Sequence, residues 1–174
     1  MKNVLIIQGT ARSGRQSIKV TQFLAKIVKN NFSQKLAVKI ADPAEIKLEL
    51  DGRLQPEQDQ TYHHLLEWAD AFIIVVPEYN HGYPGSLKRL LDSEYELYAE
   101  KPVGLVGVSA GFAGGARVVD AILPVLSVLQ LQILPYKVYV SYVEKKFDGK
   151  GNLLDESLEK RLRKMIETVL KNIR

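Results

Sequence analysis

Cysteine is absent from this sequence. Its absence excludes disulfide bonds, thiolate nucleophiles, cysteine-ligated zinc and iron–sulfur clusters. It also gives no indication that the chain folds in an oxidising compartment. Any chemistry must therefore come from other side chains, from the backbone or from a bound group.

Long apolar runs and a strong net charge are also lacking. No run approaches the about 20 apolar residues of a membrane-spanning helix, and the start MKNVLIIQG is too short for a signal peptide. We therefore expect a cytoplasmic protein with no membrane partner. Lys and Arg number 24 against 20 Asp and Glu, a net charge of +4, and no basic stripe is interleaved with aromatic residues. This surplus suits anionic small molecules, and we expect no nucleic-acid partner.

What the sequence does contain is an alternation of short apolar runs and longer amphipathic segments. The apolar runs predict buried strands at residues 3–8, 36–42, 71–77, 102–110 and 133–141. Periodicity and capping predict helices that start at Ser17, span 57–69, 84–99 and 116–130, and follow an N-cap at Asp155. Residues 43–56 are expected to form a loop. This alternation predicts one doubly wound α/β domain over residues 1–174, with five parallel strands in the order 2-1-3-4-5 and helices on both faces.

In that topology the ligand crevice opens at the carboxyl ends of strands 1 and 3, with strand 4 beside them. These three strands are followed by GTARSGRQS (9–17), PEYNHGYPG (77–85) and SAGFAGGAR (109–117). The loops after strands 2 and 5 have no comparable density of glycine and hydroxyl groups. The sequence therefore predicts a ligand site at one edge of the sheet.

The first of these loops resembles two nucleotide-binding motifs without matching either. Gly9 and Gly14 have the spacing of a Walker loop, but Arg15 and Gln16 stand where that loop has Lys and Ser or Thr. The dinucleotide fingerprint also fails, because Ala11 stands where its second glycine belongs. The loop therefore predicts neither a nucleoside triphosphate nor a dinucleotide.

What the loop offers instead suits a phosphate monoester. It has hydroxyls at Thr10, Ser13 and Ser17 and a guanidinium at Arg12 or Arg15. The backbone N–H groups at the start of the following helix add further donors. The alternative is a polar turn in which Ser17 only caps the helix.

The loop after the third strand is stiff and aromatic. Pro77 and Pro84 restrict its backbone, and Gly82 permits a positive φ. Asn80 offers both a donor and an acceptor. Such a loop suits a flat heteroaromatic ligand; the alternative is a stiff connector whose tyrosines only pack.

The loop after the fourth strand has glycine at positions 111, 114 and 115, which lets another group approach the backbone closely. The alternative is a flexible turn. No catalytic side chain and no metal ligand are predicted. His81 lacks a matching pair of carboxylate and nucleophile, and His63 and His64 lie on a predicted helix, where we expect a structural or exposed position.

These three segments resemble the NADPH-dependent FMN reductase family of flavodoxin-like proteins, which includes quinone, azo-dye and chromate reductases. GTARSGRQS is similar to the family's G-S-x-R-x-x-S phosphate loop, and SAGFAGGAR resembles its S-x-G-x-x-G-G-x-R turn. PEYNHGYPGSLKRLLD is very close to the signature P-E-Y-N-x-x-x-P-G-x-L-K-N-x-x-D. The chain departs from these family motifs at two positions. Thr10 replaces the usual serine of the phosphate loop, and Arg89 replaces the asparagine that follows the lysine at position 88.

The resemblance implies a flavodoxin-like fold, FMN as cofactor and NADPH or NADH as reductant. It implies that the FMN phosphate is held by Thr10, Arg12, Gln16 and Ser17. One side of the isoalloxazine ring would be lined, largely through backbone amides, by Pro77, Glu78, Tyr79, Asn80 and Gly82. Its pyrimidine side would be covered by Ser109, Gly111 and Gly114.

The implied activity is electron transfer from NAD(P)H through the flavin to a small-molecule acceptor: a quinone, an azo compound, a metal oxyanion or free flavin. The alternatives are a flavodoxin-type electron carrier and a redox-sensing flavoprotein without substantial NAD(P)H turnover. Flavodoxins tend to be strongly acidic and to lack arginine in the phosphate loop, so the net charge of +4 and Arg12 argue against the carrier.

Two helices predict that the chain associates with itself. The segment 116–130 is apolar around most of its circumference, and the helix 84–99 is expected to display Tyr95 and Tyr98. The resembled family is commonly oligomeric. We therefore expect a homodimer or a homotetramer.

Overall fold

The computed structural model of the protein describes residues 1–46 and 60–174. Its centre is a five-stranded sheet in the order β2-β1-β3-β4-β5, and each neighbouring pair is parallel. The strands are β1 (Lys2–Gln8), β2 (Leu36–Ala41), β3 (Ala71–Pro77), β4 (Pro102–Val108) and β5 (Gln132–Val140). The predicted fold class and strand order are confirmed.

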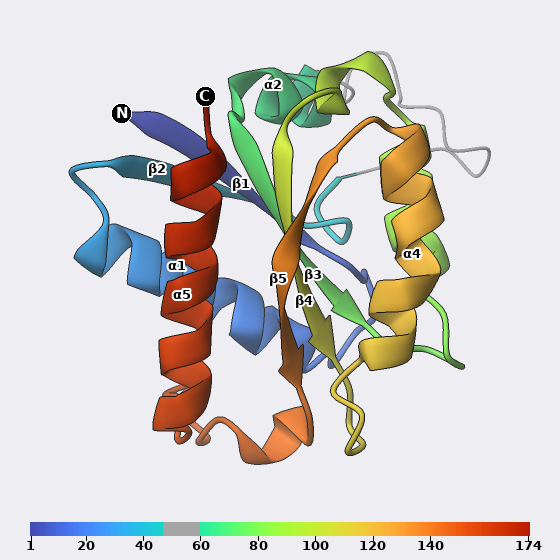
Figure 1. Ribbon diagram of the computed structural model, residues 1–174. Helices are drawn as coiled ribbons and strands as arrows, with labels where there is room; N and C mark the ends of the chain where they lie inside the picture. The colour runs from blue at the N-terminus through green and yellow to red at the C-terminus, as the bar shows by residue number, and fades with distance from the viewer. Residues whose placement is uncertain (47–59) are drawn as a thin grey trace.

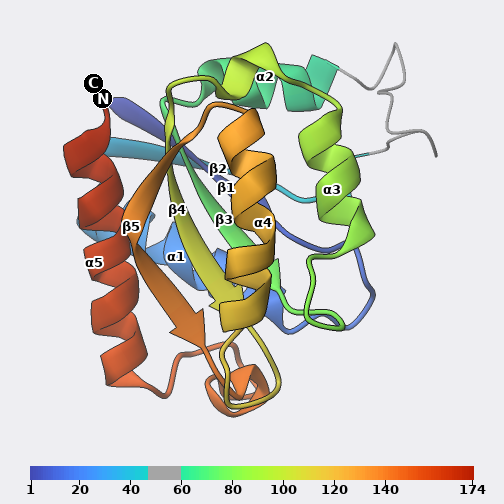
Figure 2. The same ribbon diagram turned by 45° about the vertical axis from the view of Figure 1, so that its right-hand side comes forward.

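Helices cover both faces of the sheet (Figures 1 and 2). The helices are α1 (Ser17–Asn31), α2 (Gln60–Trp68), α3 (Gly85–Asp92), α4 (Ala116–Val128) and α5 (Glu156–Asn172), with short 3₁₀ helices η1 (Glu96–Tyr98) and η2 (Val143–Lys145). One buried apolar cluster joins the sheet to α1 and α5, and a second joins it to α2, α3 and α4. Every residue of β3 and β4 is buried, because both faces of these central strands are covered.

The prediction of one helix over residues 84–99 is wrong for the second half of that range. The helix α3 ends at Asp92, and Ser93 turns the chain by donating its hydroxyl hydrogen to the Leu90 carbonyl at 2.8 Å. The short η1 that follows buries Tyr98 completely, with its hydroxyl 2.6 Å from that of Tyr62. Of the two tyrosines expected on the surface, only Tyr95 is exposed, at 50%.

Smaller differences concern the ends of elements. The strand β4 stops at Val108 and α4 at Val128, each two residues earlier than predicted. A left-handed residue at Gln130 ends the helical path. The expected start of α2 at residue 57, and most of the loop 43–56, lie outside the described residues. The N-cap at Asp155 is confirmed, since its carboxylate accepts the Leu158 N–H at 2.9 Å.

Candidate functional site

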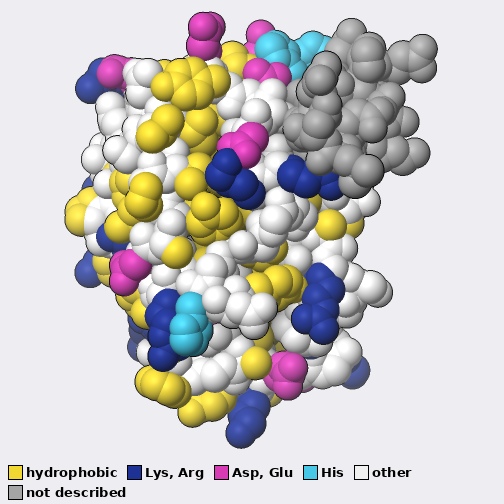
Figure 3. All heavy atoms as spheres, turned by 90° about the vertical axis from the view of Figure 1, so that its right-hand side faces the viewer, with side chains coloured by type: hydrophobic (Ala, Val, Ile, Leu, Met, Phe, Trp, Pro, Cys, Tyr) yellow, Lys and Arg dark blue, Asp and Glu magenta, His cyan; other side chains and the backbone are white. Residues whose placement is uncertain are grey.

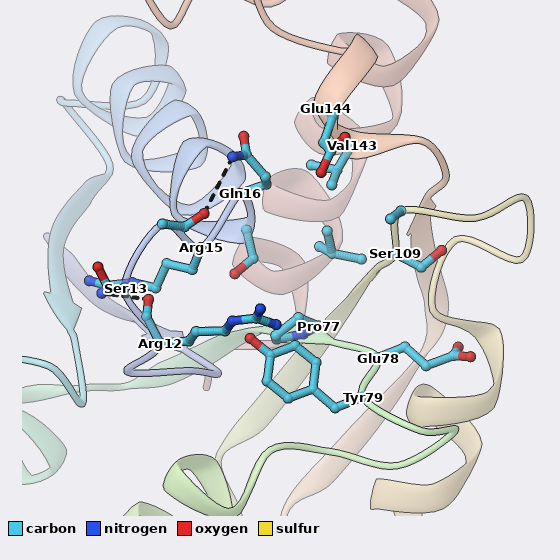
Figure 4. A pocket seen from close by; sticks show the side chains of 14 residues that line it. Arg12, Ser13, Arg15, Gln16, Pro77, Glu78, Tyr79, Ser109, Val143 and Glu144 are labelled. Carbon is cyan, nitrogen blue, oxygen red and sulfur yellow. Dashed lines mark hydrogen bonds between the residues drawn. The ribbon is translucent and has the colours of Figure 1, made fainter.

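Two adjoining cavities lie at the carboxyl ends of β1, β3 and β4. They share Glu78, Ser109 and Ala110. The first cavity, of about 310 Å³, is shown in Figure 4 and is lined by residues 12–17, 77–79, 108–110 and 143–144. The second cavity, of about 350 Å³, is lined by residues 78, 80, 81, 109–113 and 117. The three loops singled out from the sequence therefore meet, and we call the two cavities together the trough.

The first loop passes very close to the backbone of β3. The Gly9 N–H donates to the Val75 carbonyl at 2.8 Å, and a Cβ on Gly9 would come within 2.6 Å of that oxygen. Only glycine fits at this position. Gly14 then adopts a positive φ of 71° and turns the chain into α1.

The N-terminus of α1 opens onto the first cavity. Gln16 is the N-cap residue, and its side chain bonds the Gly14 carbonyl at 3.3 Å instead of capping the helix (Figure 4). The free N–H groups of the first turn and the helix dipole make this end a site for an anion. Ser17 is only 2% exposed, and its Oγ accepts from Gln8 Nε2 at 2.7 Å, which leaves its own hydrogen to donate.

The structure separates the two arginines that the sequence left as alternatives. Arg15 is bound to Asp42 after β2, and both side chains are largely buried. Arg12 lies over the Tyr79 ring, with 5.8 Å from the guanidinium carbon to the ring centroid. Among the described residues Arg12 has no carboxylate partner, so its charge is free to bind an anion in the first cavity, whereas the charge of Arg15, which also lines this cavity, is already paired.

Thr10 lies beside the trough and does not line it. This residue is 2% exposed, and its Oγ1 lies 3.2 Å from the Tyr79 hydroxyl while accepting the Arg12 N–H at 3.2 Å. A second link joins the Ala11 N–H to Ser86 Oγ at 3.3 Å. These contacts connect the loop after β1 to the loop after β3 and to the first turn of α3.

The loop after β3 forms a tight turn. Tyr79 and Gly82 exchange two backbone hydrogen bonds of 2.9 Å, so Gly82 closes the turn and lines neither cavity. The positive φ angles that we expected at Gly82 fall instead on Asn80 (49°) and His81 (64°), the two central residues of the turn. Their N–H groups have no acceptor within residues 1–46 and 60–174. Both remain available to a ligand.

The glycines of the loop after β4 have two different roles. Gly114 and Gly115 have positive φ and pack tightly, since a Cβ on Gly114 would lie 2.9 Å from Tyr139 Cβ. Gly114 therefore supports the turn from outside the trough. Gly111 lines the second cavity, where an added Cβ would meet no atom within 4 Å. Ser109 lines both cavities and donates to the Gly111 carbonyl at 2.9 Å.

Most of the predicted site residues face the trough together. Those that line it are Arg12, Gln16, Ser17, Pro77, Glu78, Tyr79, Asn80, Ser109 and Gly111. Thr10, Gly82 and Gly114 shape the loops without lining it. The first cavity is also lined by Val143 and Glu144 of η2, which follow a left-handed Tyr142 after β5, where no site residue was predicted. Their residue types carry no sequence signal for binding.

Within the described ranges, no cluster of three or more His, Asp or Glu residues has the geometry to hold a metal ion. No helix of that part of the chain is long and apolar enough to span a membrane. A 2.8 Å hydrogen bond to Glu94 raises the pKa of His63. Neither residue lines the trough.

Comparison with known proteins identifies the family. The profile of the NADPH-dependent FMN reductases matches residues 2–145. The chain is 26% identical over 161 residues to a quinone reductase of Pseudomonas putida, covering 89% of this chain and 86% of that protein. It is 30% identical over 141 residues to an NAD(P)H-dependent FMN reductase of Schizosaccharomyces pombe, covering 76% and 69%.

The fold matches as well. The flavoenzyme FerB of Paracoccus denitrificans, an NAD(P)H:(acceptor) oxidoreductase, superposes with a TM-score of 0.80 at 21% identity, covering 99% of this chain and 97% of that one. The chain therefore belongs to the NADPH-dependent FMN reductase family. It is an oxidoreductase of the flavodoxin-like fold, with FMN and NAD(P)H as its cofactors.

Proposed function

We propose that the trough holds FMN and that the protein passes electrons from NADPH or NADH to small acceptors: quinones, azo compounds, metal oxyanions or free flavin. The observation that carries this proposal is the meeting of an anion site with a ring-sized hollow. Arg12 and the start of α1 lie at the first cavity, and the second cavity opens directly beside it. FMN has this shape, a phosphate monoester joined through a ribityl chain to a flat ring.

The phosphate is assigned to Arg12, Gln16 and Ser17. The Arg12 guanidinium, the buried Ser17 hydroxyl with its free hydrogen and the uncapped N–H groups at the start of α1 are suitable donors for a dianion. Thr10 serves the same site indirectly, because its hydroxyl holds the Arg12 N–H and the Tyr79 hydroxyl. This role accounts for a hydroxyl at a position that is closed to the cavity.

The ring is assigned to the part of the trough between Pro77, Glu78, Tyr79 and Asn80 on one side and Ser109 and Gly111 on the other. Gly82 and Gly114 would serve the ring indirectly, because they hold the backbone of these two loops. When bound, FMN supplies the redox chemistry, taking hydride from the nicotinamide at N5 and passing electrons to the acceptor. The chain's own part is to orient the ring and to donate hydrogen bonds from Asn80 and His81. No side chain is assigned as a catalytic acid or base.

An absorption spectrum of the purified protein, before and after incubation with FMN and desalting, tests the proposal. We expect the two visible bands of oxidised flavin to remain with the protein and to bleach on anaerobic addition of NADPH or NADH. A colourless protein that also fails to reduce free FMN would contradict it. Turnover with NADPH and a quinone separates the enzyme from an electron carrier, which binds FMN without turning over NADPH.

We also propose that the protein acts as a homodimer or homotetramer in the cytoplasm, where reduced nicotinamide nucleotides are supplied. An apolar groove of about 470 Å³ lies between α3, the segment that follows it and α4, and Tyr95 and Val128 line it at 50% and 65% exposure. Figure 3 shows hydrophobic side chains gathered on this side of the molecule. A second copy of the chain would bury them.

A further inference from the structure

The carboxylate of Glu78 is incompletely satisfied. Its side chain is 9% exposed and lines both cavities of the trough. One oxygen, Oε1, accepts from Arg117 Nη1 at 3.2 Å. The other, Oε2, is enclosed and has no hydrogen-bond partner in the described part of the chain. A buried acceptor without a donor is costly, so a donor from a ligand is expected here.

The two members of the Glu78–Arg117 pair differ in exposure. The Arg117 side chain is 48% exposed, whereas the Glu78 side chain is 9% exposed. The pair joins the loop after β3 to the first turn of α4, and both residues line the second cavity. It therefore presents a carboxylate acceptor and a guanidinium donor side by side at the wider end of the trough.

The backbone N–H of Glu78 is not available to a ligand. It donates to the Val108 carbonyl at 2.9 Å, which continues the pairing of β3 with β4. In Figure 4 the side chain points away from Arg12 and Tyr79. The side chain therefore offers an acceptor on the side of the second cavity, which Glu78 also lines.

We propose that the side chains of Glu78 and Arg117 form hydrogen bonds with the imide edge of the flavin ring. In oxidised isoalloxazine this edge carries one donor, N3–H, between the carbonyls at C2 and C4. Glu78 accepts the N3 hydrogen, and Arg117 donates to a neighbouring carbonyl. The terminal torsion of a glutamate is broad, so rotation of the carboxylate brings its free oxygen to the trough while Arg117 keeps the other. This inference rests on the proposed binding of FMN in the trough.

The test compares the Kd of FMN with that of N3-methyl-FMN, which lacks the donor, by quenching of flavin fluorescence. We expect the wild-type protein to bind the methylated flavin about tenfold or more weakly, because methylation leaves the carboxylate without its donor. In Glu78→Leu the ratio of the two Kd values should fall to about one. Glu144→Leu is the matched control, since this glutamate lines only the first cavity, and it should keep the wild-type ratio.

The outcomes separate this inference from the proposed function. Failure of the wild-type protein to bind FMN would overturn both. Tight binding of FMN with equal binding of the methylated flavin would overturn the inference alone, and this comparison needs no variant to fold. A wild-type ratio that persists in Glu78→Leu would also overturn it, because discrimination would then be steric.

Discussion

Two arginines three residues apart serve different partners. Arg12 is available to the first cavity, whereas Arg15 is bound to Asp42. We expect Arg12→Met to weaken FMN binding by about 1.5 to 3 kcal/mol, roughly tenfold to a hundredfold in Kd, because a charged hydrogen bond to phosphate is lost. Binding of riboflavin, which lacks the phosphate, should not change. Fluorescence titration with both flavins measures the difference.

Arg15→Met is the matched control for that variant. It leaves the Asp42 carboxylate without its cation, so its principal effect should be a lower melting temperature. Equal losses of FMN affinity in the two variants, with riboflavin affected as well, would contradict the assignment of the phosphate to Arg12.

The Tyr79 hydroxyl holds the loop after β1 through Thr10. Tyr79→Phe removes this one hydrogen bond and keeps the ring, so we expect FMN to dissociate about fivefold faster, corresponding to about 1 kcal/mol. Stopped-flow fluorescence with excess competing apoprotein measures the rate. Tyr83→Phe is the control, because its hydroxyl has no hydrogen bond among the described residues and it lines neither cavity. Equal dissociation rates in the two variants would show that the Tyr79 hydroxyl does not slow the dissociation of FMN.

At the scale of elements, the cap of α5 offers a test of stability. The Asp155 carboxylate accepts from Lys146 Nζ at 2.6 Å and from the Leu158 N–H at 2.9 Å, which together lower its pKa. We expect Asp155→Ala to lose about 1 kcal/mol of unfolding free energy at neutral pH. A lowered pKa stabilises the fold above the ordinary aspartate pKa and loses this contribution as pH falls through the folded value.

The difference in unfolding free energy between the wild type and Asp155→Ala should therefore become smaller when the pH falls below about 4. Urea denaturation at neutral and acid pH gives the two free energies. A difference that stays constant with pH would mean that the carboxylate charge plays no part in the cap.

The strands were predictable from sequence because of how they are buried. The central strands β3 and β4 are covered on both faces, so their sequences are continuous apolar runs. The break after α3 was not predictable from periodicity, since Tyr95 and Tyr98 keep the helical spacing of Leu87 and Leu91. Burial of Tyr98 against Phe72 and Tyr62, which lie 26 and 36 positions earlier in the chain, decides the path there.

The site was predictable to the extent that its residue types are unusual. Glycine, hydroxyl and arginine in a βα loop indicate an anion, and the loops of three neighbouring strands meet in any sheet of this order. Val143 and Glu144 reach the first cavity through the backbone path after β5, and nothing in their chemistry indicates it. The pairing of Arg15 with Asp42 likewise depends on the end of β2, which is distant in sequence.

At the scale of the whole molecule, the groove between α3, the segment that follows it and α4 predicts self-association. We expect sedimentation at micromolar concentration to show dimers or tetramers of the 19.6 kDa chain. Val128→Glu should shift them toward monomers, because it places a charge in the groove. Leu154→Glu is the control, since Leu154 is equally exposed, at 65%, and lies outside the groove. Only 19.6 kDa particles in the wild type would contradict the prediction.

The trough is assembled from loops that follow four of the five strands, between residues 9 and 144. No single loop contains the whole binding surface, so the affinity for flavin exists only while the sheet holds these loops together. Ligand and fold are then linked by mass action: FMN at about 100 times its Kd would add about 2.7 kcal/mol to the free energy of unfolding. A cell short of riboflavin would therefore hold less of this protein in its folded state.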